Sequence, residues 1–216
     1  MNNITFRNVC PDIFSSRGLS TTSDIWQREE VRFERGRKYL IECASGTGKS
    51  SLCSYITGMR NDFSGEILFD GRKSSQLRIR DWIDMRRHGV SLMYQELRLF
   101  PELTAIENVE IRSRLGHDTT REEILDWFDK LGLRDKVDTP LRLLSFGQQQ
   151  RVALMRSLAL RSDFILLDEP VSHLDDRNIE IMSELIESKA QSWNAGVIVT
   201  SIGRHPAMSY DKVMAL

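Results

Sequence analysis

The stretch that decides the fold reads Tyr39-Leu40-Ile41-Glu42-Cys43-Ala44-Ser45-Gly46-Thr47-Gly48-Lys49-Ser50. It begins with a short apolar run typical of a buried β-strand, and apolar residues recur after it at helical spacing, at 52, 56 and 59. A glycine-rich turn between a strand and a helix is the setting of a phosphate-binding P-loop. We therefore predict a strand, a phosphate loop and a helix that starts near Lys49.

The residue types of this loop suit the binding of phosphate groups. Glycines at 46 and 48 let successive backbone N–H groups turn inward around phosphate oxygens, and the start of the helix adds its positive dipole end. Lys49 supplies a charge for the outer phosphates, and the Ser50 hydroxyl can ligate Mg²⁺. The residues that we expect to bind the nucleotide in this loop are Ser45, Gly46, Thr47, Gly48, Lys49, Ser50 and Ser51.

Cys43 stands where the usual P-loop motif opens with glycine. If this position requires a left-handed backbone, a side chain there costs about 1–2 kcal/mol. We expect Cys43 to be a small packed residue rather than a reactive thiol. Together with Cys10 and Cys53 it makes an odd number of cysteines without metal-ligand spacing, which favours a reducing compartment over a disulfide framework.

A second apolar run, at 164–167, leads directly into Asp168 and Glu169. Open α/β sheets place their ligand sites at the carboxyl ends of strands, where these two residues would lie. We expect the two carboxylates to point to opposite sides. Asp168 would hold Mg²⁺ directly or through water, and Glu169 would polarise the water that attacks the outer phosphate.

Short apolar runs bounded by turn signals predict further β-strands, at 67–69, 90–93 and 197–200. Helical periodicity after the strands at 39–41 and 164–167 gives alternating strands and helices, which is typical of a mostly parallel sheet. Other features predict additions to it. An Asp-Gly turn at the end of 65–71 and the N-terminal strand at 4–9 indicate a small antiparallel β layer. Helical spacing dominates between about 100 and 160.

Length and composition set the limits of these predictions. The 216 residues carry 30 Lys and Arg against 31 Asp and Glu, a formal charge of -1, so no global positive field would gather nucleic acid or acidic lipid. With 40% hydrophobic residues and no apolar run near the roughly 18–20 that cross a bilayer, the chain is predicted to be globular. The N-terminus lacks the features of a secretory signal, so we expect a cytoplasmic protein.

A third motif begins 23 residues before Asp168 and reads Leu144-Ser145-Phe146-Gly147-Gln148-Gln149-Gln150-Arg151. It resembles the LSGGQ signature of ATP-binding-cassette (ABC) ATPases. The resemblance covers essentially the whole chain and keeps the family's motif order: phosphate loop, Gln95 as the Q-loop, signature, acidic pair, and a D-loop at 171–175. It implies an α/β P-loop NTPase with a mostly parallel sheet core, a small antiparallel β layer and an inserted helical subdomain at approximately 97–160 of a single 1–216 domain.

The resemblance also implies a mode of action. Such nucleotide-binding domains form ATP-dependent head-to-tail dimers, in which each ATP lies between one subunit's phosphate loop and the other's signature. Asp175 would connect the two sites. The catalytic residues would be Glu169, Gln95 and Lys49; the metal ligands would be Ser50, Gln95 and Asp168; and the signature would contribute Ser145, Gly147 and Gln148 to ATP binding from the other subunit. The implied cofactors are ATP and Mg²⁺.

The sequence departs from the family pattern beside the γ-phosphate. Phe146 replaces the first glycine of the signature pair, and Ser201 stands where the family usually has a switch histidine. A serine hydroxyl is shorter than imidazole and carries no charge at neutral pH. His205 could replace the histidine only if its loop folds back. For adenine stacking, Phe14 lies near the place that the family uses, with Trp26 and a packing role as alternatives. We expect His173 to be interfacial rather than catalytic.

The leading hypothesis is the ATP-hydrolysing subunit of an ABC transporter-type complex, bound to the cytoplasmic membrane through a separate transmembrane, permease-like subunit. The alternative is a nucleotide-gated assembly or regulatory ATPase with slow or nearly lost hydrolysis, which Phe146 and Ser201 motivate. A DNA-repair or translation cassette is disfavoured by the absence of a basic face, a coiled-coil insertion or a second cassette, so no nucleic-acid partner is expected. The signature argues against a small-molecule kinase.

Overall fold

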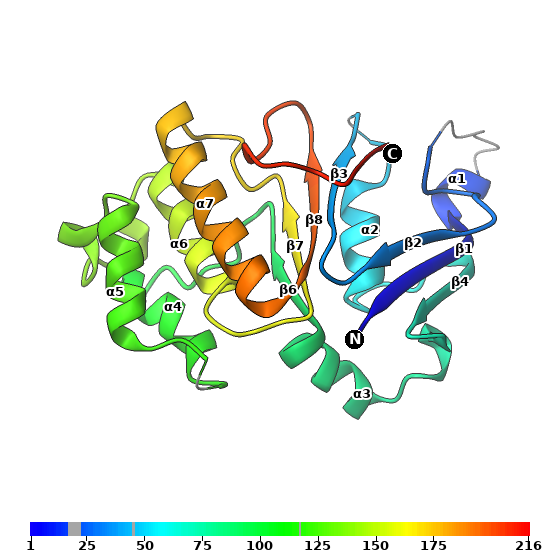
Figure 1. Ribbon diagram of the computed structural model, residues 1–216, viewed down its shortest axis with the longest axis horizontal. Coiled ribbons are helices and arrows are strands. Elements are labelled where there is room, and N and C mark those ends of the chain that lie inside the picture. The colour runs from blue at the N-terminus through cyan, green and yellow to red at the C-terminus, as the bar shows by residue number, and fades with distance from the viewer. Residues whose placement is uncertain (17–22, 45, 117) are drawn as a thin grey trace.

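The computed structural model describes residues 1–16, 23–44, 46–116 and 118–216 (Figure 1). The strands are β1 Asn3–Pro11, β2 Val31–Glu34, β3 Lys38–Glu42, β4 Phe63–Phe69, β5 Arg72–Lys73, β6 Val90–Met93, β7 Phe164–Asp168, β8 Gly196–Ser201 and β9 Lys212–Ala215. The α-helices are α1 Asp12–Ser16, α2 Lys49–Ile56, α3 Ile79–Asp84, α4 Ala105–Ser113, α5 Arg121–Lys130, α6 Phe146–Ser157 and α7 Asp176–Trp193. A π-helical turn, Met85–Gly89, continues α3.

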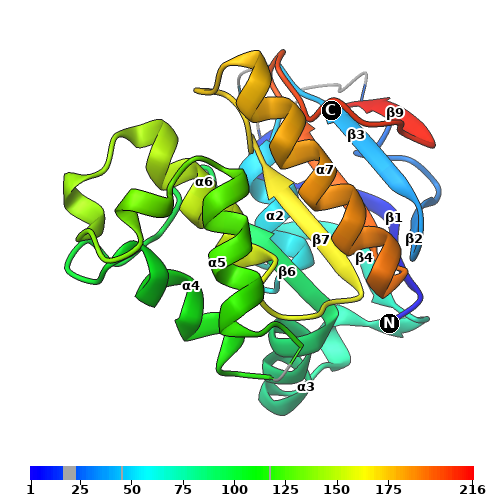
Figure 2. The ribbon, with the colours of Figure 1, turned by 60° about the vertical axis from the view of Figure 1, so that its left-hand side comes forward.

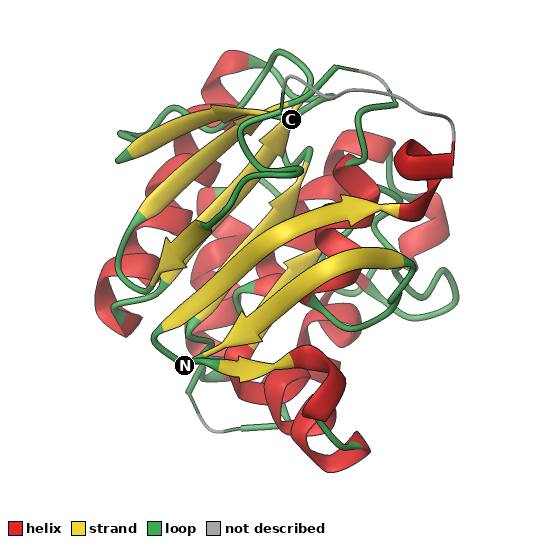
Figure 3. Ribbon diagram, turned by 90° about the vertical axis from the view of Figure 1, so that its right-hand side faces the viewer, coloured by secondary structure: helices red, strands yellow, loops and turns green. Residues whose placement is uncertain are grey.

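The strands form two sheets. The parallel sheet has the order β6-β7-β8-β3-β9, and the antiparallel sheet has the order β2-β1-β4-β5. Figure 3 views the molecule from the side of the antiparallel strands, with most helices behind them. The predicted α/β fold with its small antiparallel layer is confirmed, and β2, β5 and β9 are strands that the sequence patterns did not predict.

Two hydrophobic clusters cover the two faces of the parallel sheet. Alternate residues of β7 divide between them: Ile165 and Leu167 face the cluster formed with α4 to α7, and Leu166 faces the cluster that contains α2 and the antiparallel sheet. The helices α4, α5 and α6 gather beyond the β6 edge (Figure 1), and α7 lies across the sheet in Figure 2. Burial on both faces explains why β7 reads as a continuous apolar run.

Helix α2 is shorter than the sequence spacing suggests. It ends at Ile56, and Gly58 follows with a φ of 63°, closely covered by the Trp82 ring: a Cβ on Gly58 would lie 2.3 Å from that ring. Met59, expected on the apolar face of the helix, is 44% exposed. The left-handed backbone at Gly58 breaks the helix, and the close approach of Trp82 leaves no room for a side chain there.

The parallel arrangement brings three strand ends together. Asp168 at the end of β7 lies opposite Thr200 of β8, and Glu42 at the end of β3 lies opposite Ser201. The phosphate loop leaves β3 at the same edge. Among the described residues, no helix is both long and apolar enough to cross a lipid bilayer.

Candidate functional site

The phosphate loop has the backbone geometry that its glycines predict. Gly46 and Gly48 have φ angles of 81° and 98°, in the left-handed region, and α2 begins directly afterwards at Lys49. A Cβ on Gly46 would meet nothing within 4 Å, which leaves open space on that side of the loop. Ser45, another predicted nucleotide-binding residue, lies outside the described residues.

Two aromatic residues support the loop from inside the protein. The Trp26 indole donates a hydrogen bond to the Thr47 carbonyl at 2.9 Å, and a Cβ on Gly48 would lie 3.2 Å from the Phe14 ring. Trp26 is 1% exposed and Phe14 is 8% exposed. Phe14 therefore packs beneath the phosphate loop and presents little surface on which adenine could stack. This agrees with a packing role for Phe14, one of the alternatives to adenine stacking.

Cys43 fits the loop without strain. Its backbone is not left-handed, so the cost considered for a side chain at this position does not arise. Its N–H donates to the Ser201 carbonyl at 2.9 Å, and the buried thiol lies 3.4 Å from the Ile41 carbonyl. Burial raises the pKa of this thiol to about 11, against the opposing pull of Lys49. Cys43 is a packed residue, as predicted.

The acidic pair meets the phosphate-loop lysine. The Lys49 ammonium forms an ion pair with the Glu169 carboxylate and lies 3.9 Å from Asp168 Oδ1. The expectation that the two carboxylates point to opposite sides is wrong in this respect. The reason is local: Glu169 has a φ of 49°, so the alternation of the strand stops at Asp168. Both carboxylates consequently face one lysine.

Thr200 is a site residue to which the sequence patterns assigned no role. Its hydroxyl donates to Asp168 Oδ1 at 2.6 Å, and its carbonyl accepts from the Glu169 N–H at 3.1 Å. Burial raises the pKa of Asp168 above its ordinary value, while the Thr200 hydrogen bond and Lys49 act in the opposite direction. The only signal in the sequence was the position of Thr200 at the end of a predicted neighbouring strand.

The remaining predicted ligands near the phosphate loop differ in exposure. Ser50 is exposed at the start of α2, and Gln95 is exposed in the loop after β6. Ser51 is buried, and its hydroxyl accepts a hydrogen bond from Arg60 at 3.1 Å. Ser50 is thus open to solvent beside Lys49, whereas the Ser51 hydroxyl already has a protein partner.

The signature segment begins helix α6. The Ser145 hydroxyl accepts from the Gln148 N–H at 3.3 Å, and the Gln148 side chain accepts from the Ser145 N–H at 2.9 Å, which is a capping box. The Phe146 ring is 47% exposed and meets the His173 ring edge to face, with centroids 4.6 Å apart. In Figure 1 strands β6 and β7 lie between α6 and α2. The start of the signature helix and the phosphate loop are therefore on different sides of these strands.

Gln150 connects the signature helix to the acidic pair. Its side-chain amide donates to the Glu169 carbonyl at 3.1 Å and lies 3.5 Å from the Ser172 hydroxyl. Gln150 is buried and lies on α6, about 1.4 turns after its N-cap Ser145. The sequence showed it only as one of three successive glutamines, and no pattern distinguishes which of them faces inward.

The loop after β8 places no imidazole beside Lys49. Ser201 is 1% exposed, and its hydroxyl donates to the Arg204 carbonyl at 2.7 Å. His205, the possible replacement for the switch histidine, packs edge to face on Tyr210, with centroids 5.5 Å apart, and its Nδ1 lies 3.1 Å from the Pro206 carbonyl. Its ring is therefore engaged with its own loop.

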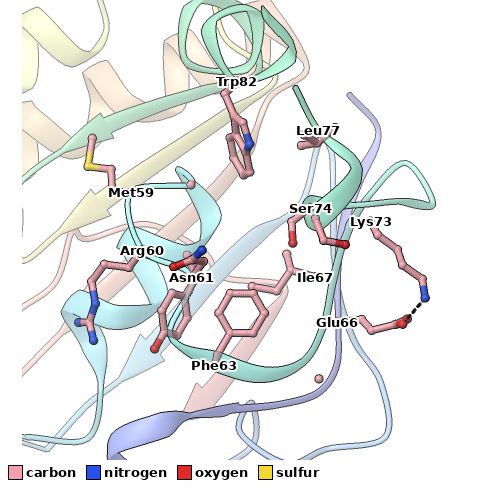
Figure 4. Close-up of a pocket in the computed structure, with 14 residues that line it drawn as sticks. Met59, Arg60, Asn61, Phe63, Glu66, Ile67, Lys73, Ser74, Leu77 and Trp82 are labelled. Carbon is pink, nitrogen blue, oxygen red and sulfur yellow. Dashed lines mark hydrogen bonds and ion pairs between the residues drawn. The ribbon is translucent and has the colours of Figure 1, made fainter. Parts of the chain in front are cut away.

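A cavity of about 650 Å³ lies away from these residues, between the end of α2, β4, β5 and α3 (Figure 4). Tyr55, Phe63 and Trp82 contribute its aromatic walls, and an ion pair between Lys73 and Glu66 lies at its side. None of the residues that line it is a predicted site residue. The cluster at the phosphate loop is thus distinct from this cavity.

Comparison with known proteins agrees with the site geometry. Residues 27–172 match the family model described as ABC transporter. The chain belongs to this family. It is 32% identical over 186 residues to the L-cystine import ATP-binding protein TcyC of Bacillus subtilis (strain 168), covering 82% of this chain and 74% of that protein. It is 31% identical to the macrolide export ATP-binding/permease protein MacB of Shewanella sp. (strain ANA-3), covering 84% of this chain but only 28% of that protein.

Solved ATP-binding cassettes share the fold of this chain. A dimeric post-hydrolysis state of the ATP-binding cassette MJ0796, bound to ADP and Pi, superposes with a TM-score of 0.72 at 25% identity, covering 92% of this chain and 87% of that one. A second dimeric MJ0796 structure gives a TM-score of 0.71 at 26% identity. This ABC nucleotide-binding chain is therefore an ATPase with the P-loop NTPase fold.

Proposed function

We propose that this cassette drives a membrane transport complex by binding ATP between two copies and hydrolysing it. The observation that carries the proposal is the meeting of Lys49 with Asp168 and Glu169 at the end of the parallel sheet. One cation and two carboxylates beside an open glycine-rich loop match the needs of phosphoryl transfer: charge for the phosphates, a metal ligand and a base.

The polar groups around the loop fit a magnesium nucleotide. Ser50, Asp168 and Gln95 offer hydroxyl, carboxylate and amide oxygens, the ligand types that Mg²⁺ prefers, and these residues would hold the ion. Bound Mg²⁺ would neutralise charge on the phosphates. The backbone of Gly46, Thr47 and Gly48 would surround the phosphates, with Ser45 before them in the sequence and Ser51 in the first turn of α2. In this arrangement Lys49 exchanges its ion pair with Glu169 for the outer phosphates.

Glu169 is the proposed general base. A carboxylate released by Lys49 would accept the proton of the water that attacks the outer phosphate. The Gln150 amide fixes the Glu169 carbonyl, and Thr200 fixes its N–H, so the backbone of the base is held from two sides. Gln95 would position the same reaction from the exposed loop after β6.

Ser145, Gly147 and Gln148 are proposed to act on the ATP of the other subunit. Ser145 is exposed, and the N–H groups of Phe146 and Gly147 at the start of α6 have no acceptor within the helix, so they favour a negative charge. The signature and the phosphate loop lie in different parts of one chain, which suits a head-to-tail dimer with two shared sites. We further propose that the cassette spans residues 1–216, with a helical subdomain at approximately 97–160.

The partner is proposed to be a separate permease-like subunit in the membrane. TcyC and MacB are named for import and for export respectively, so the relatives support a transport role without fixing its direction. The cassette would then lie at the cytoplasmic side of the membrane, attached through that subunit. Gln95, in an exposed loop, is placed near this contact by the same proposal.

Hydrolysis by the isolated cassette is proposed to be slow. The Ser201 hydroxyl is engaged with the Arg204 carbonyl, and His205 packs on Tyr210, so neither offers a cation to the γ-phosphate. This observation also favours the second candidate function, a nucleotide-gated assembly in which hydrolysis is nearly lost. The two differ in whether a partner restores turnover.

The test is steady-state ATP turnover with Mg²⁺, measured for the purified cassette alone and after reconstitution with the co-purifying membrane protein. A Glu169→Gln variant, which keeps the size of the side chain and removes the base, is the control. We expect the cassette alone to turn over ATP slowly and the membrane partner to stimulate this turnover. We expect no stimulation of the Glu169→Gln variant. Turnover equal to that of Glu169→Gln under both conditions would favour the assembly function, and rapid turnover alone would contradict the slow rate.

A further inference from the structure

The loop after β8 is anchored at the phosphate loop. The Ser201 carbonyl accepts the Cys43 N–H at 2.9 Å, and the Ser201 hydroxyl donates to the Arg204 carbonyl at 2.7 Å. Ser201 is buried, so both of these bonds are shielded from water. The backbone at Arg204 is thereby joined, through one residue, to the first residue of the phosphate loop.

The Arg204 side chain extends from this anchor to the D-loop, residues 171–175. Its guanidinium donates to the Leu174 carbonyl at 2.5 Å and forms an ion pair with Asp176, the first residue of α7. Gly203, with a φ of 100°, provides the turn before it. A guanidinium shared between a carbonyl and a carboxylate makes two charge-assisted hydrogen bonds in fixed directions, which a shorter polar side chain could not reproduce.

The D-loop in turn touches the residues on which hydrolysis depends. It follows Glu169 after a single proline, and the Ser172 hydroxyl lies 3.5 Å from the Gln150 amide that also bonds the Glu169 carbonyl. On its other side His173 meets the ring of Phe146 in the signature. Arg204 therefore joins the loop after β8, which is bonded to Cys43, to the D-loop. The D-loop in turn contacts the signature, so three parts of the site that are far apart in the sequence are connected.

We propose that Arg204 is a positioning residue for ATP hydrolysis, holding the D-loop to the loop after β8 while Ser201 holds that loop to the phosphate loop. This rests on the proposed function. Arg204 does not touch the nucleotide. It fixes the segment that follows the general base and that, in the proposed dimer, faces the other subunit. Because misplacing a reacting group slows the chemical step more than it weakens binding, losing Arg204 lowers kcat and leaves KM for ATP nearly unchanged.

The test compares Arg204→Ala, Arg204→Lys and Asp176→Ala with the wild type, by kcat and KM for ATP and by Tm. Arg35→Ala is the matched control. Like Arg204, Arg35 combines backbone carbonyls with a carboxylate: its guanidinium bonds the Asn194 and Trp193 carbonyls and pairs with Asp163, at a place remote from the phosphate loop. We expect kcat to fall about tenfold in Arg204→Ala, as for coupling residues of this kind. Arg204→Lys should recover part of the rate, and Arg35→Ala should lower Tm without changing kcat.

A double variant separates positioning from general stability. If Arg204 acts through Asp176, Arg204→Ala combined with Asp176→Ala loses no more kcat than Arg204→Ala alone. An active wild type with an unchanged kcat in Arg204→Ala overturns this inference alone. A kcat that falls equally in Arg35→Ala also overturns it. So does a double variant whose loss of kcat is the sum of the two single losses, when Arg204→Lys recovers none of the rate. A wild type that hydrolyses no ATP, alone or with its membrane partner, overturns the proposed function and this inference with it.

Discussion

The two halves of the proposed ATP site are built differently within one chain. Lys49 at the start of α2 and Asp168 at the end of β7 are 8% and 6% exposed, and each has a polar partner in the same chain. At the start of α6, Ser145 and Phe146 are exposed, and their contacts are a helix cap and one ring contact with His173. The phosphate-loop half is assembled in a single chain, whereas the signature half is an exposed surface that faces a second chain in the proposed dimer.

Removal of the phosphate-loop cation is expected to have the largest effect. Lys49→Ala leaves Asp168 and Glu169 without their cation and removes the charge proposed to meet the outer phosphates, so we expect ATP hydrolysis to fall by at least about 100-fold. Phosphate release measured at saturating ATP and Mg²⁺ checks this. A turnover within a few-fold of the wild type would show that the meeting of Lys49 with the acidic pair has no part in catalysis.

Mixing two inactive variants tests directly whether the halves belong to different subunits. Ser145→Arg, which places a bulky cation at the exposed signature, is expected to be inactive by itself. When this variant is mixed in equal amounts with Lys49→Ala, half of the dimers contain one subunit of each kind. Each mixed dimer has one intact site and one site that lacks both groups. We expect recovery of about a quarter of the wild-type turnover. An absence of recovery, when subunit exchange is verified, would place both halves in the same chain.

The caps of α5 and α6 allow a milder comparison. Ser145 and Thr120 each accept a hydrogen bond from the N–H three residues later, at 3.3 and 3.2 Å. Ser145→Ala and Thr120→Ala should each lower the free energy of unfolding by about 1 kcal/mol, because each loses one cap. Only Ser145→Ala should lower ATP turnover. Equal turnover in both variants, with equal losses of stability by denaturant titration, would limit Ser145 to capping.

Much of the phosphate-loop half could be predicted from the sequence because its residues are close together in short motifs with fixed backbone demands. Gly46 and Gly48 have the left-handed angles that the motif requires, and Asp168 ends a strand as its apolar run predicts. The position of Glu169 relative to Asp168 was not predictable in this way, because a single left-handed residue interrupts the alternation on which the expectation rested.

Contacts between distant segments account for the rest. The bond from Thr200 to Asp168 depends on β7 and β8 being neighbours in register, and the contacts of Arg204 depend on the path of the loop after β8. Phe14 illustrates the same limit: its place in the sequence is compatible with contact to adenine, but the packing of the antiparallel sheet buries it under the phosphate loop. Periodicity identifies the strands but not their partners.

Stability should depend on pH through the closed half of the site. Burial raises the pKa of Asp168, so its ionised form lowers the stability of the folded protein at neutral pH. Asp168→Asn keeps an oxygen for the Thr200 hydroxyl and carries no charge. We expect the variant to have a higher Tm than the wild type at pH 7. The gap should close as pH falls through the folded-state pKa, where Asp168 becomes protonated. A gap that is constant down to pH 4 would contradict this cause.

The reactivity of Cys43 gives the smallest and most local test of the closed half. Its pKa of about 11 leaves about one thiol in a thousand ionised at pH 8, and 8% exposure limits access of reagent. Iodoacetamide should therefore label Cys43 much more slowly in the folded protein than in urea, with a rate that rises between pH 8 and 10, as measured by mass spectrometry of the peptide. Labelling at equal rates in both states would mean that the phosphate-loop half opens readily in a single chain. The two halves would then differ less in accessibility than their exposed fractions indicate.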